Sequence, residues 1–201
     1  MKTLYLMRHG QTRFNQQKRI QGASDSPLTE LGIEQAELAK KYFEDEGLSF
    51  DAVYASTQER AGDTAQIVSD RTDITRLKGL KEMDFGAMEA QPEYLNPPLY
   101  KDGTGYRDAF VFYGGEDSMA VRQRMVDTLT ELMENIEDGI QILVVSHGAA
   151  ISQFFRGVLE KAPAIHGMSN CAILKFTFEK GRFEMHYVYN PVQGTYVYKK
   201  K

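Results

Sequence analysis

Two short apolar runs, residues 4–7 and 142–145, are continuous rather than alternating. Continuous runs of this length are typical of strands that are buried on both faces of a parallel sheet. A third candidate strand spans 52–55. Ser56 follows it, with Glu59 three residues further on, which is the pattern of a capping box. We therefore expect a helix with Ser56 as its N-cap.

Apolar residues recur at helical spacing in three further segments. Thr29 is the expected N-cap of the first, the second lies at about 118–137, and the third follows Gly148. Near the C-terminus the period changes to two over 174–178 and 183–189, which predicts a β-hairpin. Helices and strands that alternate in this way predict an α/β fold with helices on both faces of a mostly parallel sheet.

One segment, residues 87–114, resists this scheme because its aromatic residues and prolines follow neither period. We interpret it as an irregular, lid-like insertion over the edge of the sheet. No linker-like stretch interrupts the chain, so we expect a single domain over residues 1–201. The lysines at 199–201 are expected to be a solvated tail.

Charge and composition exclude several kinds of partner. Lys and Arg total 24 against 28 Asp and Glu, a net charge of −4, whereas nucleic-acid binding usually calls for a basic excess. No apolar run approaches the ~20 residues of a membrane span, so no membrane partner is expected and the cytoplasm is the default location. The single cysteine, Cys171, excludes a disulfide within the chain.

Residues with phosphate chemistry follow the candidate strands. Ligands of open parallel sheets bind outside the carboxyl ends of the strands. The first strand leads into Arg8 and His9, the second leads to Arg60, and the third leads into His147 and Gly148. Two histidines and two arginines that are far apart in sequence are therefore expected at one edge.

A phosphate monoester suits this set of side chains. Arginines bind phosphate oxygens bidentately, and a neutral imidazole, here His9, can attack phosphorus. A second imidazole, His147, kept protonated beside the anion, could stabilise the charge of the transferred group. A proton donor is needed for the leaving alcohol, for which Glu82 is the candidate and Asp84 the weaker one.

Six sequence blocks add a family resemblance. They are Leu6 to Asn15, Gln21 to Gly32, Ala55 to Ala65, Glu82 to Gly86, Gly114 to Asp117, and Val144 to Gly148. In this order they resemble the signature blocks of the histidine phosphatase superfamily, the phosphoglycerate mutase-like group. Two departures, Ala90 and Asp117, remove no catalytic group.

The resemblance implies a three-layer α/β/α sandwich and a role for each matching residue. His9 would be the nucleophile, and Arg8, Arg60 and His147 would complete the phosphate pocket. Glu82 would be the proton donor and acceptor. The implied substrate-binding residues are Asn15, Gln21, Gly22 and Gly148, although Gln21 could equally cap a turn. No metal and no cofactor are implied.

Several functions remain open at this point. The length of the chain and the segment 82–86 resemble the phosphatase branch. We therefore expect a phosphatase that acts on a small phosphate monoester, with a phosphoglycerate mutase-type phosphotransferase as the alternative. Arg13, Lys18 and Arg19 could hold a second anionic group, or could be a solvated loop. A non-catalytic phospholigand sensor is a further alternative, although such a protein would be expected to lose the nucleophile or the proton donor.

Two other enzyme classes fit less well. A zinc site of His9 and His147 with a carboxylate lacks local ligand spacing, and the arginines would repel a dication. A serine hydrolase at Ser146 lacks the glycine-flanked nucleophile elbow. The sequence assigns neither the physiological substrate nor the oligomeric state.

Overall fold

A seven-stranded sheet runs through the molecule, in the order β3-β2-β4-β1-β5-β6-β7. The computed structural model describes residues 1–100, 102, 104–165 and 168–200. The first four strands in this order are parallel, and the last three are antiparallel. Their bounds in chain order are Lys2–Arg8 (β1), Ala52–Ser56 (β2), Thr75–Leu77 (β3), Gln141–Ser146 (β4), Ile173–Glu179 (β5), Arg182–Asn190 (β6) and Thr195–Lys199 (β7).

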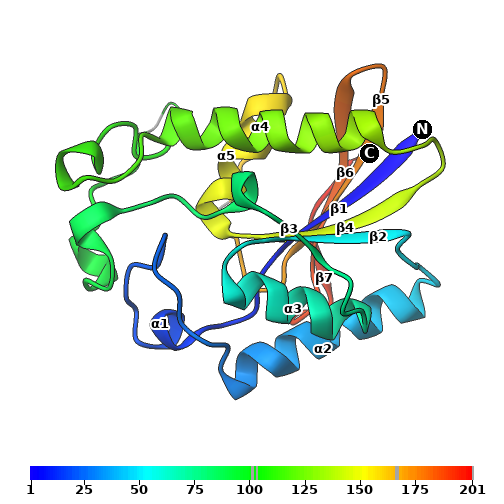
Figure 1. Ribbon diagram of the computed structural model, residues 1–201, viewed down its shortest axis with the longest axis horizontal. Coiled ribbons are helices and arrows are strands. Elements are labelled where there is room, and N and C mark those ends of the chain that lie inside the picture. Colours follow the sequence, from blue (N-terminus) through cyan, green and yellow to red (C-terminus); the bar gives the residue numbers. More distant parts are fainter. Residues whose placement is uncertain (101, 103, 166–167, 201) are drawn as a thin grey trace.

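Helices cover both faces of the sheet. Figure 1 shows α4 and α5 on one side and α2 and α3 on the other. The helices are Arg13–Gln16 (α1), Glu30–Asp45 (α2), Glu59–Ser69 (α3), Ser118–Asn135 (α4) and Gly148–Val158 (α5). The predicted α/β sandwich is confirmed, and its sheet is mixed. No helix in the described ranges is long and apolar enough to cross a membrane.

The continuous apolar runs occupy the centre of the sheet, where both faces are covered. Leu4 and Leu6 of β1 pack into the core beneath α4 and α5, whereas Tyr5 and Met7 pack into the core beneath α2 and α3. All four side chains are 0% exposed. Successive side chains of a strand point to opposite faces, so an unbroken apolar run is what a strand between two cores requires.

The predicted helix start at Ser56 is wrong. Ser56 is the last residue of β2 and pairs in register with Leu77 of β3, so the ladder holds it in extended backbone. The helix α3 begins at Glu59, with Gln58 as its N-cap. The Ser56 hydroxyl accepts the N–H of Gln58 at 3.2 Å. Ser56 therefore stabilises the turn that leads into α3 and is not the N-cap of this helix.

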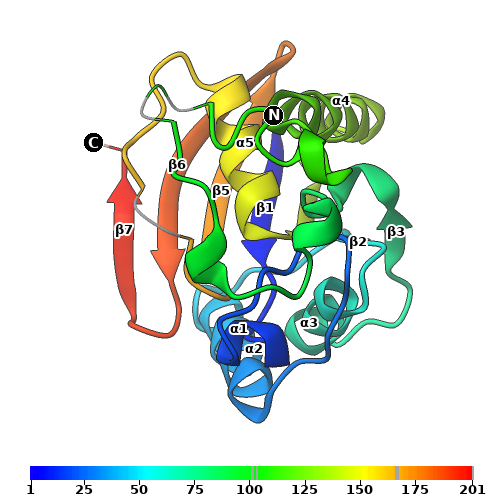
Figure 2. The same ribbon diagram turned by 90° about the vertical axis from the view of Figure 1, so that its left-hand side faces the viewer.

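Two strands escaped the sequence analysis. The edge strand β3 has only three residues, two of which are exposed, so it shows no apolar run. The other edge strand, β7, includes Lys199, which the sequence analysis assigned to a solvated tail. Figure 2 shows β7 at one edge of the sheet and β3 at the other.

The described residues of the segment 86–113 contain no strand and three 3-10 turns, Gly86–Met88, Glu93–Leu95 and Val111–Tyr113. Phe110 is 0% exposed and packs edge-on against Phe85 and Tyr106, with ring centroids 4.7 and 5.0 Å away. Phe112, in contrast, is 90% exposed. Only part of the aromatic content of this segment therefore serves as core.

Candidate active site

The carboxyl ends of β1 and β4 and the start of α3 meet at one edge of the sheet. Arg8 pairs in register with Ser146, and the backbone N–H of His9 donates to the carbonyl of Ser146 at 3.1 Å. The His9 and His147 ring centroids are 5.1 Å apart. Arg60, the second residue of α3, places its Nε 3.3 Å from Nε2 of His9. The structure thus brings together the two arginines and two histidines that the sequence places at strand ends.

The hydrogen bonds of His9 select its tautomer. Its Nδ1 lies 2.7 Å from the carbonyl oxygen of Gly10, and because a carbonyl only accepts, Nδ1 carries the proton. Nε2 keeps its lone pair, to which Arg60 donates. Burial of the ring, together with the charges of Arg60 and Arg8, holds the pKa of His9 well below its usual value. The ring is therefore neutral at pH 7, which is the nucleophilic form of imidazole.

His147 is the N-cap of α5 and is 0% exposed. Its Nε2 lies 2.8 Å from Oγ of Ser56, and its buried Nδ1 has no partner among the described residues. Burial and the nearby charge of Arg60 hold the pKa of His147 well below its usual value. The pocket therefore favours a neutral ring, unlike the protonated ring expected from the sequence. When the Ser56 hydroxyl donates to Nε2, the neutral ring still presents an N–H at Nδ1.

Arg60 is fully buried and uses its whole guanidinium group. Nη2 donates to the carbonyl of Gly22, and Nη1 donates to the carbonyl of Ser24, each at 2.9 Å. Nη1 also forms an ion pair with Asp25 at 2.8 Å. These contacts hold the loop 22–25 against Arg60, which in turn contacts His9. Gly22 therefore helps to fix the position of Arg60.

One donor atom of Arg8 has no hydrogen-bond partner among the described residues. Its Nη1 donates to the carbonyl of Met168, whereas its buried Nε has no partner in the described part of the chain. Gly148 lies directly beside it, since a Cβ at this position would be 3.4 Å from that Nε. Unsatisfied buried polar atoms are rare in native proteins and call for an explanation. Nε of Arg8 and Nδ1 of His147 are two such atoms, and a bound anion would satisfy both.

Glu82 lies against the N-terminus of α5. Its Oε1 accepts the N–H groups of Met83 and Ala150 at 2.9 and 2.8 Å, and its Oε2 accepts the N–H of Ala149 at 3.0 Å. The carboxylate is 7% exposed. It is thus fixed in position, and Oε2 retains a lone pair that could carry a proton.

Asn15 and Gln21 both lie near the site, but their polar groups differ in availability. The Gln21 amide accepts from Thr12 Oγ1 at 2.6 Å and donates to Ser26 Oγ at 2.9 Å. Both of its ends therefore brace the loop, which favours the turn-forming interpretation. Asn15 Oδ1 accepts from Thr12 N at 3.2 Å and from Asn170 Nδ2 at 3.3 Å, while its Nδ2 donates to no group in the described ranges.

Comparisons with known proteins agree with this geometry. The family model of the histidine phosphatase superfamily (branch 1) matches residues 4–191. The chain belongs to this superfamily. It is 30% identical over 189 residues to the probable phosphoglycerate mutase GpmB of Yersinia pestis (strain Pestoides F), covering 90% of this chain and 86% of that protein.

Two solved structures extend the comparison. One is a mutant phosphoserine phosphatase of Entamoeba histolytica in complex with phosphoserine, 29% identical, with a TM-score of 0.79 over 95% of this chain and 98% of that one. The other is the phosphoglycerate mutase of Bacillus anthracis str. Sterne, 25% identical, with a TM-score of 0.80 over 92% of this chain and 91% of that one. The superfamily enzymes that this chain resembles thus include both phosphatases and mutases.

In this member of the histidine phosphatase superfamily, Glu89 organises the loop beneath Arg60. Its Oε1 accepts from the N–H groups of Ala23 and Phe85 at 2.8 and 3.0 Å. Its Oε2 accepts from the N–H groups of Gly22 and Ser24 at 3.0 and 3.2 Å and from the Ser24 hydroxyl. The sequence analysis gave Glu89 no role, because a carboxylate in an irregular segment carries no signal in a single sequence.

Gln58 is a second supporting residue that the sequence analysis gave no role. It is 5% exposed, its Nε2 donates to the carbonyl of Gly22, and its Oε1 accepts the N–H of Glu82 at 2.9 Å. It thereby links the loop under Arg60 to the expected proton donor. The sequence analysis placed the helix start at Ser56 rather than at Gln58, and it offered no sign of the long-range partners of Gln58.

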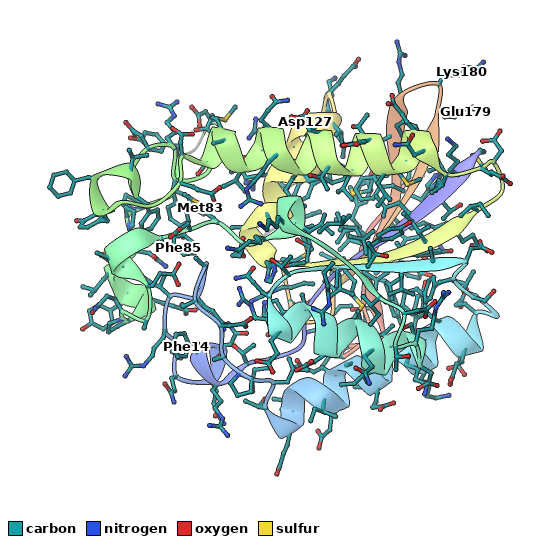
Figure 3. All side chains as sticks on the ribbon, viewed as in Figure 1. Phe14, Met83, Phe85, Asp127, Glu179 and Lys180 are labelled. Atoms are coloured by element: carbon teal, nitrogen blue, oxygen red, sulfur yellow. The ribbon has the colours of Figure 1, made fainter. Side chains whose placement is uncertain are left out.

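A pocket of about 380 Å³ opens beside these residues. Arg8, Glu82 and Gly148 form one end of it, and the more deeply buried His9, Arg60 and His147 are not part of its walls. Asn15 and Gln21 also line it. Figure 3 shows Met83 and Phe85, two apolar residues of the wall, on the same side of the molecule as Phe14.

Several residues that the sequence singled out do not line this pocket. Asp84 Oδ1 accepts the N–H of Gly86 at 2.8 Å, so of the two candidate proton donors it is Glu82 that lines the pocket. The side chains of Arg13, Lys18 and Arg19 are likewise absent from its walls. Of the two histidines that the sequence analysis did not assign to the site, His186 lies in β6 and His166 falls outside the described residues.

The alternative enzyme classes find little support in the geometry. Ser146 is 0% exposed, and its hydroxyl donates to the carbonyl of Leu80 at 2.8 Å. Within residues 1–100, 102, 104–165 and 168–200, no group of three or more His, Cys, Asp or Glu side chains is placed to hold a metal ion.

Proposed function

We propose that this protein hydrolyses phosphate monoesters through a phosphohistidine at Nε2 of His9. The observation that carries the proposal is the tautomer of His9, whose Nδ1–H donates to Gly10 and leaves Nε2 unprotonated. Two of the buried atoms that have no partner among the described residues, Nε of Arg8 and Nδ1 of His147, lie on residues that flank this ring. A phosphoryl group beside Nε2 would give both of them an acceptor.

The first chemical step forms the N–P bond. Nε2 of His9 attacks phosphorus, the P–O bond to the leaving alcohol breaks, and the carboxyl group of Glu82 gives its proton to the alcohol oxygen. Arg8 and the N–H of Gly148, which has no acceptor among the described residues, bind the transferred oxygens. Oriented N–H groups and arginine charges of this kind stabilise the charge that develops on the phosphoryl group.

The second step returns the enzyme to its starting state. Glu82 takes a proton from water, the water oxygen attacks phosphorus, and the N–P bond breaks to release inorganic phosphate. The net reaction is ester plus water to alcohol plus phosphate, with no change in the protonation of His9 or Glu82. In a mutase, the phosphohistidine would instead return the group to a substrate hydroxyl.

Mutase activity is the second candidate because relatives of both kinds resemble this chain to a similar degree. One feature supports hydrolysis over transfer, the phosphatase-like segment 82–86. The two functions separate in one pair of assays. Phosphate release and the conversion of 3- to 2-phosphoglycerate are measured on the same preparation, and conversion that exceeds release would overturn the phosphatase proposal.

The nucleophile is tested with p-nitrophenyl phosphate in the presence of EDTA. We expect phosphate release to survive EDTA, to disappear in His9→Ala, and to persist in His186→Ala, which removes an imidazole far from the pocket. Loss of activity with EDTA, or full activity in His9→Ala, would contradict the mechanism. Acid quenching of the wild type with ³²P-labelled substrate should trap label on the protein, and His9→Ala should trap none.

A further inference from the structure

The helix α5 forms one wall of the pocket with a stripe of side chains. Gly148, Ser152 and Arg156 line the pocket at intervals of four residues. Residues at this spacing lie on one face of a helix, and eight residues span about 12 Å. Gly148 is beside Arg8 at the phosphate end, so Arg156 marks the far end of the same wall.

Arg156 has no counter-ion in the described part of the chain. Among the described residues its guanidinium group forms no ion pair and no hydrogen bond, and its one recorded contact is with the Phe155 ring at 5.6 Å. The charge of Arg156 contributes to lowering the pKa of Arg122, after burial of that residue. This end of the pocket therefore carries positive charge that Arg156 does not share with an acidic side chain.

The described wall holds two acidic residues, Glu82 at the phosphate end and Glu93. Burial lowers the pKa of Arg8 and raises the pKa of Tyr106, and the charges of Glu82 and, to a smaller extent, Glu93 raise both values. No ion pair joins Glu93 to Arg156 in the described part of the chain. The two ends thus differ in charge, and a ligand that fills the pocket meets an unneutralised arginine away from the phosphate.

A second unsatisfied group faces the same pocket. Asn96 lines it from the 86–113 segment, and the Oδ1 atom of Asn96 is buried without a hydrogen-bond partner in the described residues. A buried acceptor of this kind calls for a donor. A hydroxyl or amino group on a bound ligand would supply one.

We propose that Arg156 binds a carboxylate of the substrate, so that the preferred substrates are small phosphate monoesters that also carry a carboxylate group. The proposal rests on the proposed phosphatase function for the position of the phosphate. A carboxylate matches a single guanidinium group in charge and in bidentate geometry. A second phosphate would carry about twice that charge, and among the described residues Arg156 is the one arginine or lysine of the wall besides Arg8.

Size and direction agree with this assignment. The pocket of about 380 Å³ is near the lower end of the range for small-molecule sites, so it suits a substrate of a few carbons. Helical side chains lean toward the N-terminus of their helix, which brings the Arg156 guanidinium closer to Gly148 than its backbone position suggests. Arg156 thus takes the role of binding a second anionic group that the sequence analysis considered for Arg13, Lys18 and Arg19. Those three residues do not line the pocket.

The test measures binding in the His9→Ala background, where no turnover interferes. The ligands are 3-phosphoglycerate and glycerol 3-phosphate, which share a three-carbon phosphate ester and differ in the carboxylate. We expect Arg156→Gln to raise the Kd of 3-phosphoglycerate at least tenfold and that of glycerol 3-phosphate less than threefold. Arg156→Lys should give an intermediate loss, and the control Arg19→Gln should change neither Kd by more than twofold.

Two results would overturn the proposal. One is an equal change for both ligands in Arg156→Gln, and the other is no change for either. A bisphosphate such as propane-1,3-diol bisphosphate, if it alone bound in an Arg156-dependent way, would assign the site to phosphate and likewise overturn it. Variants are compared only if their unfolding midpoints agree with that of the parent.

The same design separates this proposal from the phosphatase function. If the wild type releases phosphate but Arg156→Gln keeps the parent ratio of kcat/KM for the two esters, the function stands and the carboxylate site fails. If the wild type hydrolyses neither ester while the Arg156-dependent difference in Kd is present, the carboxylate site stands and the phosphatase function fails.

Discussion

The parallel and antiparallel halves of the sheet differ in the residues that lie at the ends of their strands. Arg8 is the last residue of β1, and the other expected catalytic residues, His9, Arg60, Glu82 and His147, follow the parallel strands β1, β2, β3 and β4 in that order. The three antiparallel strands carry none of them. Both halves have buried centres, so the difference lies in what happens at the strand ends.

Strand direction explains the division. Parallel strands end at the same edge, and the segments that leave them begin there, so side chains and helix N-termini gather at one place. Antiparallel strands end alternately at opposite edges, and their polar side chains bond across the ladder instead. Thr177 of β5 and His186 of β6 form such a pair at 2.8 Å. The expected catalytic residues therefore concentrate in the parallel half.

The sharpest test of this comparison uses two histidines with equivalent contacts. Nε2 of His147 lies 2.8 Å from a serine hydroxyl, and Nε2 of His186 lies 2.8 Å from a threonine hydroxyl. We expect His147→Asn to lower kcat/KM for p-nitrophenyl phosphate by about 10²- to 10³-fold, because removal of one transition-state donor costs this much. His186→Asn should stay within twofold. Similar losses in both variants would show that the division by strand direction is wrong.

A carboxylate pair tests the support of the site. Glu89→Gln turns one of two accepting oxygens into a donor that faces N–H groups of the loop 22–24. Left unsatisfied, each buried donor costs about 1–3 kcal/mol. We expect the free energy of unfolding to fall by about 2 kcal/mol and kcat/KM to fall by about tenfold, since the loop positions Arg60.

The matched control is Glu179→Gln at the exposed tip of the β5–β6 hairpin. Figure 3 places Glu179 and Lys180 at the end of the molecule away from Met83 and Phe85. Surface changes of this kind stay within about 0.5 kcal/mol. Urea unfolding and phosphate release are measured on both variants. A Glu89→Gln protein with parental stability and activity would contradict the positioning role.

The sequence predicted the buried strands better than the edge strands. The central strands β1 and β4 are covered on both faces, which forces a continuous apolar run that a reader of the sequence can recognise. The edge strand β3 is short and mostly exposed, so burial imposes no pattern on it. The false helix cap at Ser56 has a similar cause, since pairing of β2 with β3 overrode a local preference that the sequence showed correctly.

At the site, residues next to strand ends could be predicted, and residues that act through distant contacts could not. His9 and His147 directly follow apolar runs, so topology alone places them together. Glu89 and Gln58 act on Gly22, which is 67 and 36 residues away in the chain. A pairing over such a distance leaves no spacing to recognise, and it emerges only when the loops are packed.

At acid pH, the histidines of the parallel half should contribute more to the pH dependence of the free energy of unfolding than His186 of the antiparallel half. The pKa values of His9 and His147 lie well below their usual value because burial and the nearby arginines disfavour the charged rings. The unfolded chain then binds protons near pH 6.5 that the folded protein does not. This stabilising contribution is complete above pH 6.5 and declines as the pH falls below it. Two such rings give a slope of up to about 2.7 kcal/mol per pH unit.

The measurement is urea unfolding between pH 7.0 and 5.5 in buffer without phosphate. His9→Asn removes one of the two rings and should reduce the slope by up to about 1.4 kcal/mol per pH unit. His186→Asn should change it less, because this ring is less buried and its pKa is lowered to a smaller extent. Equal slopes in the wild type and His9→Asn would contradict a neutral His9.

The smallest expected effect lies where the antiparallel half meets α2, at alkaline pH. The Tyr42 hydroxyl donates to the Tyr187 hydroxyl at 2.9 Å, and burial, as the main cause, raises the pKa of Tyr187 to about 12. Because the folded pKa exceeds the unfolded value, this contribution to stability is complete below about pH 10 and is lost as the pH rises toward 12.

Tyr187→Phe should flatten that loss, lower the free energy of unfolding at pH 7 by about 1 kcal/mol, and leave kcat/KM within twofold. Urea unfolding at pH 7, 9.5 and 11 checks the first two, and a phosphate-release assay checks the third. A loss of activity larger than the loss of stability explains would place a functional role in the half of the sheet that carries none of the expected catalytic residues.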